Sequence, residues 1–293
     1  MQNAAFGRCH PAVCALFFTL AVCLGVILFH PAALACSLAA ALLFYACLAG
    51  RGALRLAAGL VPLLCLVTAL QPLFNPRGDT VLFSLLGRPY TLEALASGAA
   101  MAVMAGALLV WFACLNRILT ADKLTFLLAP LAPALSLVLV QVLRLLPHYR
   151  RRALQIAAAR KGVGLGESGS TRQTLRQGLV SLSGLSQWAL EGGIAAADAM
   201  TARGYGCGPR TGYRPWRFTA ADRALTAGML ILAAAVIFCA IRGGFAFAAL
   251  PALSAACTGF TLWGTGLYAA LLVLPTAYSL WEELLWLISR WNI

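Results

Sequence analysis

Residues 9–50 read CHPAVCALFFTLAVCLGVILFHPAALACSLAAALLFYACLAG and decide the fold class, because they contain no Asp, Glu, Lys or Arg. An α-helix needs about 20 apolar residues to cross the hydrocarbon layer, and it satisfies its own backbone hydrogen bonds there. This stretch is long enough for two helices, near 11–29 and 32–50, with a turn at His30-Pro31. The first run could be mistaken for a signal peptide, but it continues into the second without a clear cleavage site. We therefore expect both to be retained.

Further apolar runs flank a basic central segment. Two precede it, at 56–73 and 94–115, and two follow it, at 224–241 and near 264–286. The part around 245–260 could be a further span or a re-entrant segment, and we favour about six spans in all. The chain is 61% hydrophobic and 11% charged, whereas soluble domains carry about a quarter charged residues, so lipid must supply part of its solvent. We therefore predict an all-α, polytopic membrane protein with about six transmembrane helices.

The positive charges predict the orientation in the membrane. Of the 22 Lys and Arg residues, 15 lie between Arg117 and Arg223. If six spans start from a cytoplasmic N-terminus, 19 of the 22 stay inside and 3 lie outside, and the reverse topology would translocate the 19. Because Lys and Arg are retained inside, we expect a multi-pass protein of a bacterial inner or plasma membrane with a cytoplasmic N-terminus and central segment. No nucleic-acid recognition motif accompanies the basic block, so we expect no nucleic-acid partner.

One uncharged run tests this topology. Residues 124–143 read LTFLLAPLAPALSLVLVQVL and are long enough to cross the membrane, but a crossing would place the 13 Lys and Arg residues of 144–223 outside. Pro130 and Pro133 also break a helix near its start. We therefore expect a helix pair in or near the cytoplasmic interface, with an apolar side packed on lipid or on another protein. An apolar surface of that size implies a partner.

Two glycine-terminated helices follow in the central segment. The first is expected over 144–161 and stops at 162–164, and the second runs roughly over 171–203 and stops at 204–206. Each ends in an Ala-rich stretch, a cation in the last turn and then Gly. A cation there complements the helix dipole, and Gly accepts the left-handed C-cap conformation.

The two helix ends align residue for residue, in the pairs Lys161 with Arg203, Gly162 with Gly204, and Gly164 with Gly206. Two helices that merely share good capping residues would look the same. The alternative is a duplicated docking device, with one copy for each of two similar partners.

The second end also resembles a known family. Ala202-Arg203-Gly204 is similar to the second Ala-Arg-Gly coupling motif of the transmembrane T subunits of energy-coupling-factor transporters, and Arg210-Thr211 and Tyr213 follow as in that family. The first motif resembles Ala159-Arg160-Lys161-Gly162, which departs from Ala-Arg-Gly by one residue. Either Lys161 replaces the arginine, or Arg160 serves after a one-residue insertion.

Other segments carry the same resemblance along most of the chain: Arg144 and Pro147, His30-Pro31, Leu73-Phe74-Asn75-Pro76 with Gly78, and Glu282/Glu283 to Trp286. The resemblance implies a non-catalytic transport subunit without a cofactor. Its implied partners are two ABC-type ATPase subunits, each holding one coupling helix end, and a small membrane S component that captures a vitamin or a transition-metal ion such as cobalt or nickel. Residues 124–143 are then the candidate platform for the S component.

The resemblance divides the chain into three parts. Residues 1–116 form the N-terminal transmembrane helices, about four in number; 117–222 form a coupling-helix domain on the cytoplasmic side; and 223–293 form the C-terminal transmembrane helices. Within the second part, Arg150-Arg151-Arg152 either contact anionic lipid heads or line an acidic ATPase surface.

Two other functions compete with this interpretation. A self-sufficient secondary transporter would show interrupted helices in related halves and polar residues at mid-membrane. An integral-membrane enzyme would need carboxylates, histidines or a metal cluster, and only Glu282 and Glu283 form a close acidic pair. The GxGxxG match at 164–169 follows no strand, so a linker is the better interpretation and we expect no nucleotide site. The ten cysteines show no metal-ligand spacing and no disulfide framework, and the three histidines are isolated in sequence, so we expect no metal site.

Overall fold

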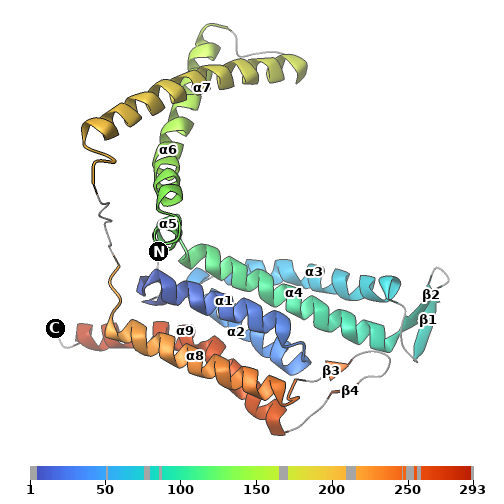
Figure 1. The fold of residues 1–293 in the computed structure, drawn as a ribbon. Helices are drawn as coiled ribbons and strands as arrows, with labels where there is room; N and C mark the ends of the chain where they lie inside the picture. Colours follow the sequence, from blue (N-terminus) through green and yellow to red (C-terminus); the bar gives the residue numbers. More distant parts are fainter. Residues whose placement is uncertain are drawn as a thin grey trace. The chain divides into compact units, whose positions relative to one another are not determined.

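The chain divides into two helical units (Figure 1). The computed structural model describes residues 5–50, 52–75, 80–85, 88–164, 171–208, 216–245, 247–248, 254–255 and 259–291. The first unit combines Met1–Thr120 with Trp216–Ile293, and the second is Ala121–Pro215. The first and last of the three predicted segments therefore fold together as one body. Because the described residues are almost entirely helical and several helices have membrane-spanning length, the predicted all-α polytopic class is confirmed.

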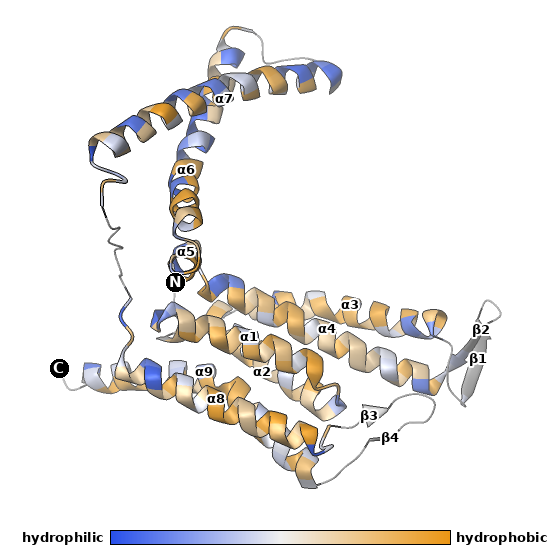
Figure 2. Ribbon diagram, viewed as in Figure 1, coloured by the Kyte–Doolittle hydropathy of each residue, from blue (hydrophilic) through white to orange (hydrophobic). Residues whose placement is uncertain are grey.

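The first unit contains six apolar helices, and we call it the membrane unit. They are α1 (Pro11–Ile27), α2 (Pro31–Ala49), α3 (Gly52–Phe74), α4 (Leu92–Ile118), α8 (Ala220–Ile241) and α9 (Gly259–Trp291). Five of these helices are long and apolar enough to cross a membrane, and α1 is shorter, with 17 residues. Each apolar run that the sequence predicts as a span therefore lies on a helix. Figure 2 shows these helices as mostly hydrophobic along their length.

Short non-helical elements complete the membrane unit. A 3₁₀ turn, η1 (Ala5–Arg8), precedes α1. Two antiparallel hairpins follow later in the chain, β1 (Val81–Leu85) with β2 (Arg88–Thr91), and β3 (Phe247–Ala248) with β4 (Ser254–Ala255). The second hairpin lies in the part around 245–260, which the sequence left open as a further span. Its described residues are strands, so they contribute no additional transmembrane helix.

Proline begins the first two long helices, as expected for a residue that has no N–H to leave unsatisfied. Pro11 and Pro31 stand at the first helical positions of α1 and α2, and the residues between these helices, 28–30, are not helical. The predicted turn at His30-Pro31 is therefore confirmed. The other end of α2 stops at Gly50, whose φ of +54° favours glycine.

An aromatic cluster forms the centre of the membrane unit. The ring of Trp111 lies 5.5 Å from Phe17, 6.3 Å from Phe18 and 6.2 Å from Phe44, measured between ring centroids. Its indole Nε1 donates a hydrogen bond to Ser37 Oγ at 3.2 Å, so the one polar atom of the ring is satisfied. This cluster joins α1, α2 and α4 at a single point.

Helices α3 and α4 approach closely because glycines line their interface. A Cβ at Gly98 would lie 2.7 Å from Gln71 Cβ, and one at Gly106 would lie 2.9 Å from Leu64 Cδ2. Small residues allow such close packing of membrane helices. On α3, only Leu60 and Pro72 are buried, so its remaining surface is available to lipid.

A capping box begins α8 and ties it to the start of α1. The carboxylate of Asp222 accepts hydrogen bonds from the Thr219 hydroxyl at 2.7 Å, the Thr219 N–H at 3.0 Å and the His10 N–H at 3.2 Å. Thr219 Oγ1 accepts in return from the Asp222 N–H at 3.2 Å. The chain therefore re-enters the membrane unit beside its own first helix.

The second unit contains α5 (Ala121–Leu128), α6 (Pro133–Gly162) and α7 (Thr171–Ala202), and we call it the coupling-helix unit. Residues 124–143 contain a helix break as predicted, because α5 ends at Leu128 and α6 begins at Pro133. The helix expected over 144–161 is not separate, since α6 runs without interruption from Pro133 to Gly162. Pro130 lies in the connecting turn, and Pro133 occupies the first helical position, where its missing N–H costs nothing.

Helices α6 and α7 contact each other in antiparallel order. The start of α6 contacts the end of α7 through Gln141 and Met200, and the end of α6 contacts the first half of α7 through Arg160 and Gln177. On α7, none of the described side chains is fully buried. Helices α6 and α7 are therefore long and bury few side chains against each other.

Candidate functional site

The two glycine-terminated helix ends of the coupling-helix unit are the candidate site. We call the end of α6, residues 159–164, the first tip and the end of α7, residues 199–206, the second tip. The sequence predicts a helix stop at each, and each stop is present within a residue of the expected place. Among the predicted motif residues, Ala159 and Gly162 lie within α6, Ala202 is the last residue of α7, and Arg203 and Gly204 follow it directly.

The second tip has the geometry of a Schellman motif. Gly204 has a φ of +80°, its N–H donates to the Thr201 carbonyl at 2.9 Å, and the Tyr205 N–H donates to the Met200 carbonyl at 3.0 Å. These two bonds satisfy carbonyls that a helix end would otherwise leave open. Arg203 is thereby held at the C-cap, immediately before the turn, and its side chain is exposed.

The first tip closes differently. Val163 is its C-cap, the left-handed residue is Gly164 with a φ of +76°, and the Gly164 N–H donates to the Lys161 carbonyl at 3.0 Å. Gly162 is still helical. Lys161 therefore lies almost a full turn before the left-handed glycine, whereas Arg203 lies directly before its own.

The predicted residue-for-residue alignment of the two ends holds for the pair Gly164 and Gly206, which both have a positive φ, but Gly162 and Gly204 differ in backbone conformation. Superposing the caps pairs Gly164 with Gly204 and Val163 with Arg203, a shift of two residues from the sequence pairing of Lys161 with Arg203. The reason is that Gly162 continues the helix while Gly204 ends it. Glycine permits a left-handed turn without requiring one, so the composition of the motif does not decide where each helix stops.

The structure distinguishes the two cations that the sequence left open at the first tip. Arg160 Nη1 donates hydrogen bonds to the Gln177 carbonyl at 3.1 Å and to Ser181 Oγ at 3.3 Å, so its guanidinium lies against α7. Lys161 is exposed. The two exposed tip cations are therefore Lys161 and Arg203, while Arg160 joins the two helices.

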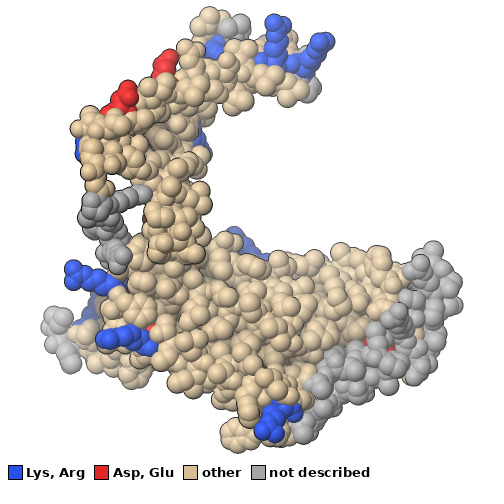
Figure 3. Space-filling model, in the orientation of Figure 1, with Lys and Arg blue, Asp and Glu red and all other residues tan. Residues whose placement is uncertain are grey.

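The charges along α7 are separated. Exposed arginines, Arg172 and Arg176, occupy its first turns, and the acids Glu191 and Asp198 lie in its second half. Figure 3 shows the basic atoms at one end of this helix and the acidic atoms further along it. Asp198 is exposed and lies just over one turn before Arg203. The second tip therefore presents a cation near a solvent-exposed acid. A molecule that docks there is expected to have a polar surface.

The start of α6 presents an apolar surface. Leu135 and Val138 are each 55% exposed, Val142 is 51% exposed, and Leu131 in the turn before α6 is 83% exposed. The spacing of 135, 138 and 142 places these three side chains on one face of the helix. Exposed apolar side chains of this number on one element mark a surface that lipid or another protein covers.

An aromatic contact that the sequence did not reveal joins the middle of the pair. The Trp188 ring of α7 lies 5.6 Å from the Tyr149 ring and 6.2 Å from the His148 ring. The Arg152 guanidinium lies 5.6 Å from the centroid of the same Trp188 ring. In the sequence, a single tryptophan in a polar helix was the only indication of this aromatic contact. Rings and a cation gathered in this way connect the helices by stacking and cation–π attraction.

The remaining sequence signals are dispersed. The Gly164 end of the GxGxxG match forms the C-cap turn, and residues 165–170 lie outside the described part of the chain, as do Arg210, Thr211 and Tyr213. Glu282 accepts a hydrogen bond from the Tyr278 hydroxyl at 3.2 Å within α9. Across the described ranges, no three His, Cys, Asp or Glu side chains gather into a set that could hold a metal ion.

These features define the class of protein: a multi-pass, α-helical membrane protein with a second unit of long, exposed helices. No protein-family model matches the chain, and no curated protein matches it.

Proposed function

We propose that this chain is the transmembrane coupling subunit of an energy-coupling-factor importer in a bacterial cell membrane, with the coupling-helix unit in the cytoplasm. The observation that carries the proposal is the pair of exposed cations, Lys161 and Arg203, each at the end of a long helix that glycine terminates. In the motif that these residues resemble, each helix end docks in a groove of one ABC-type ATPase.

The order of contacts between the helices supports two docking points rather than one. The second tip contacts α6 near Gln141, whereas the first tip lies at the other end of α6, beyond Arg160. With a rise of 1.5 Å per residue, these two places are roughly 30 Å apart along α6. Tips separated by that distance suit two soluble subunits placed side by side.

The helix pair is also suited to transmit movement. A helix of 30 residues is stiff along its axis, and α6 and α7 are connected through the Trp188 ring cluster and through Arg160. When the ATPases close or open, they carry the tips with them, and the displacement reaches the apolar start of α6. There an S component, which captures a vitamin or transition-metal ion, rests on the face formed by Leu135, Val138 and Val142 and is reoriented to release its substrate.

The decisive experiment is affinity purification of the tagged full-length chain after mild solubilisation. We expect two ABC-type ATPases and a small hydrophobic membrane protein in the eluate, and uptake that requires ATP when the assembly is reconstituted in vesicles. Transport or catalysis by the purified chain alone would instead support a secondary transporter or a membrane enzyme, and would refute the proposal.

A second experiment separates the platform from the tips. Leu135→Ser with Val138→Ser removes exposed apolar surface from α6, so we expect loss of the S component with both ATPases retained. The matched control is Leu175→Ser with Leu179→Ser, which removes similar exposed surface from α7. Loss of all partners from the first variant would mean that this part of α6 is needed only for folding.

A further inference from the structure

A groove lies beside the middle of α6, in the coupling-helix unit. It is open to the surroundings and has a volume of about 910 Å³. The lining residues come from α6, apart from one leucine of α7, and are Leu143, Leu146, Pro147, Tyr149, Arg150, Arg151, Ala153, Leu154 and Leu185. The groove therefore combines apolar walls with two guanidinium groups, and its lining contains no acidic side chain.

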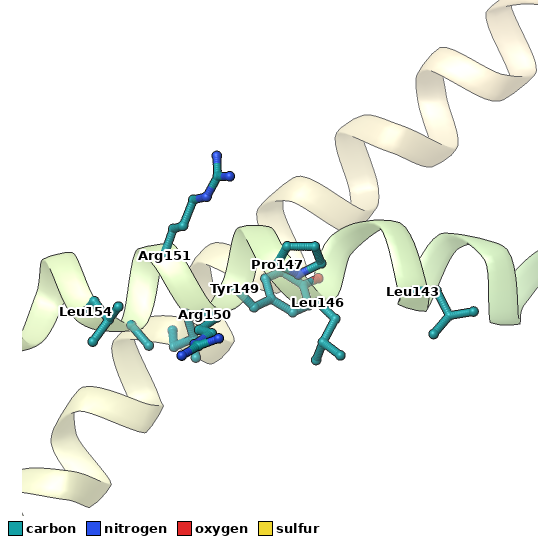
Figure 4. Close-up of a pocket in the computed structure, with 9 residues that line it drawn as sticks. Leu143, Leu146, Pro147, Tyr149, Arg150, Arg151 and Leu154 are labelled. Atoms are coloured by element: carbon teal, nitrogen blue, oxygen red, sulfur yellow. The ribbon is translucent and has the colours of Figure 1, made fainter. Parts of the chain in front are cut away.

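Arg150 and Arg151, which line the groove, differ in their contacts from the neighbouring Arg152. Arg152 lies over the Trp188 ring and donates to Gln155 Oε1 at 3.3 Å, so it is directed to the helix contact. Arg150 and Arg151 line the groove instead. In Figure 4, Arg150 extends from the same side of α6 as Leu143 and Leu146, while Arg151 extends from the other side. A ligand beside the leucines thus meets the Arg150 guanidinium on the same side of α6, while Arg151 adds charge from the other side of the helix.

The position along α6 indicates the level of a membrane surface. Residues 133–143 contain no charged residue, and from Arg144 onward the helix is basic. The uncharged part is about 16 Å long, roughly half of the hydrocarbon thickness. Arginine at such a transition buries its aliphatic stem along apolar surface and keeps its guanidinium near the lipid head groups. The groove begins at Leu143, at this transition.

Pro147 removes one backbone hydrogen bond from the part of α6 that lines the groove. Pro147 lies inside α6 and has no N–H, which leaves the carbonyl of Leu143 without its usual helical donor. This carbonyl belongs to a residue that lines the groove, one turn before Leu146 and Pro147 along the helix.

We propose that this groove binds one anionic phospholipid, with its phosphate at Arg150, Arg151 adding positive charge nearby, and an acyl chain along Leu143, Leu146 and Leu185. Charge complementarity favours an anion, and the leucines favour a ligand with an apolar tail. An acidic surface of a soluble protein would pair with the arginines but would leave the leucines in contact with polar groups. Occupation of the groove by lipid holds the middle of α6 at the membrane surface.

The test uses the full-length chain in detergent, with bound lipid measured by native mass spectrometry. The probes are phosphatidylglycerol, phosphatidylcholine with the same acyl chains, inorganic phosphate and poly-glutamate. We expect phosphatidylglycerol to bind more tightly than phosphatidylcholine, and neither phosphate nor poly-glutamate to displace it. Arg150→Gln with Arg151→Gln should weaken phosphatidylglycerol binding by about 25-fold, about fivefold for each cation removed near an anionic surface, and leave phosphatidylcholine binding unchanged.

The matched control removes the same charge from α7 through Arg172→Gln with Arg176→Gln, two exposed arginines outside the groove, and should leave phosphatidylglycerol binding unchanged. Equal losses in the two double variants would show a general charge effect and overturn the proposal. Displacement by phosphate would indicate an ion site, and displacement by poly-glutamate a protein-docking surface; either overturns it too. If the glutamine variant does not fold, Arg150→Lys with Arg151→Lys retains the charges, and the selectivity of the unmodified chain for phosphatidylglycerol still decides the question.

Discussion

The membrane unit and the coupling-helix unit are both helical but are stabilised in different ways. In the membrane unit, Trp111, Phe17 and Phe44 are fully buried, and glycines bring α3 and α4 into close contact. In the coupling-helix unit, the 30 residues of α6 include one buried residue, Ser136, and the pair is connected mainly by one ring cluster and by Arg160. The first unit is therefore a closely packed helix bundle, whereas the second consists of long helices whose side chains are mostly exposed.

The comparison predicts that a change at an exposed tip of the second unit affects transport most. Arg203→Glu should reduce ATP-dependent uptake by at least about tenfold, because reversing a docking charge costs several kcal/mol at an interface. Arg203→Lys should retain part of the activity, since the charge remains but the forked donor geometry is lost. Uptake in reconstituted vesicles measures both, with Arg172→Glu on the opposite end of α7 as the control. Full uptake by the Arg203→Glu variant would show that Arg203 is not part of the docking site.

At the first tip, the two neighbouring cations should behave differently. Lys161→Glu should lower uptake strongly without changing stability, because the side chain is exposed. Arg160→Gln removes two hydrogen bonds between α6 and α7, so it should lower the stability of the helix pair by about 1–3 kcal/mol. Uptake and thermal unfolding, measured on both variants, separate the roles. The opposite pattern would assign docking to Arg160.

The same glycine-to-alanine change should have opposite signs in the two units. Gly98→Ala places a Cβ 2.7 Å from Gln71 Cβ and should destabilise the membrane unit by about 1–3 kcal/mol through overpacking. At Gly178 on α7, an added Cβ would meet no atom within 4 Å, so Gly178→Ala should stabilise its helix by up to about 1 kcal/mol. Thermal unfolding in detergent measures both changes. Equal responses would mean that the two units do not differ in packing.

A further prediction concerns the tie between α1 and α8, whose effect should be smaller than that of Gly98→Ala. Asp222→Ala removes the capping box and the acceptor for the His10 N–H, which should cost about 0.5–2 kcal/mol. Asp198→Ala is the matched control, because that acid is exposed on α7. The midpoint of thermal unfolding should fall for the first variant only. An equal fall in the unfolding midpoint of both variants would show that burial of Asp222 adds nothing to stability beyond the effect of its charge.

Much of the architecture was predictable from the sequence because helix length, apolar runs and helix stops are local properties. The runs at 56–73 and 94–115 are helical, the turn at His30-Pro31 is present, and the break between α5 and α6 lies at the prolines. The candidate site was predictable in part. The motif composition located both tips, but the equivalence of Lys161 with Arg203 was wrong, since the two glycines that follow them have different backbone conformations.

The sequence by itself determined that the chain is an α-helical membrane protein and which apolar segments form its helices, because hydrophobicity and backbone preference act over a few turns. Only the tertiary structure decided which tip cation is exposed, which glycines sit beneath a neighbouring helix, and that Asp222 holds the start of α1. Each of these depends on contacts between distant segments, such as the His10–Asp222 bond across 212 residues. No local sequence pattern identifies a hydrogen-bond partner that far along the chain, so contacts of this kind are known only from the packing of the helices.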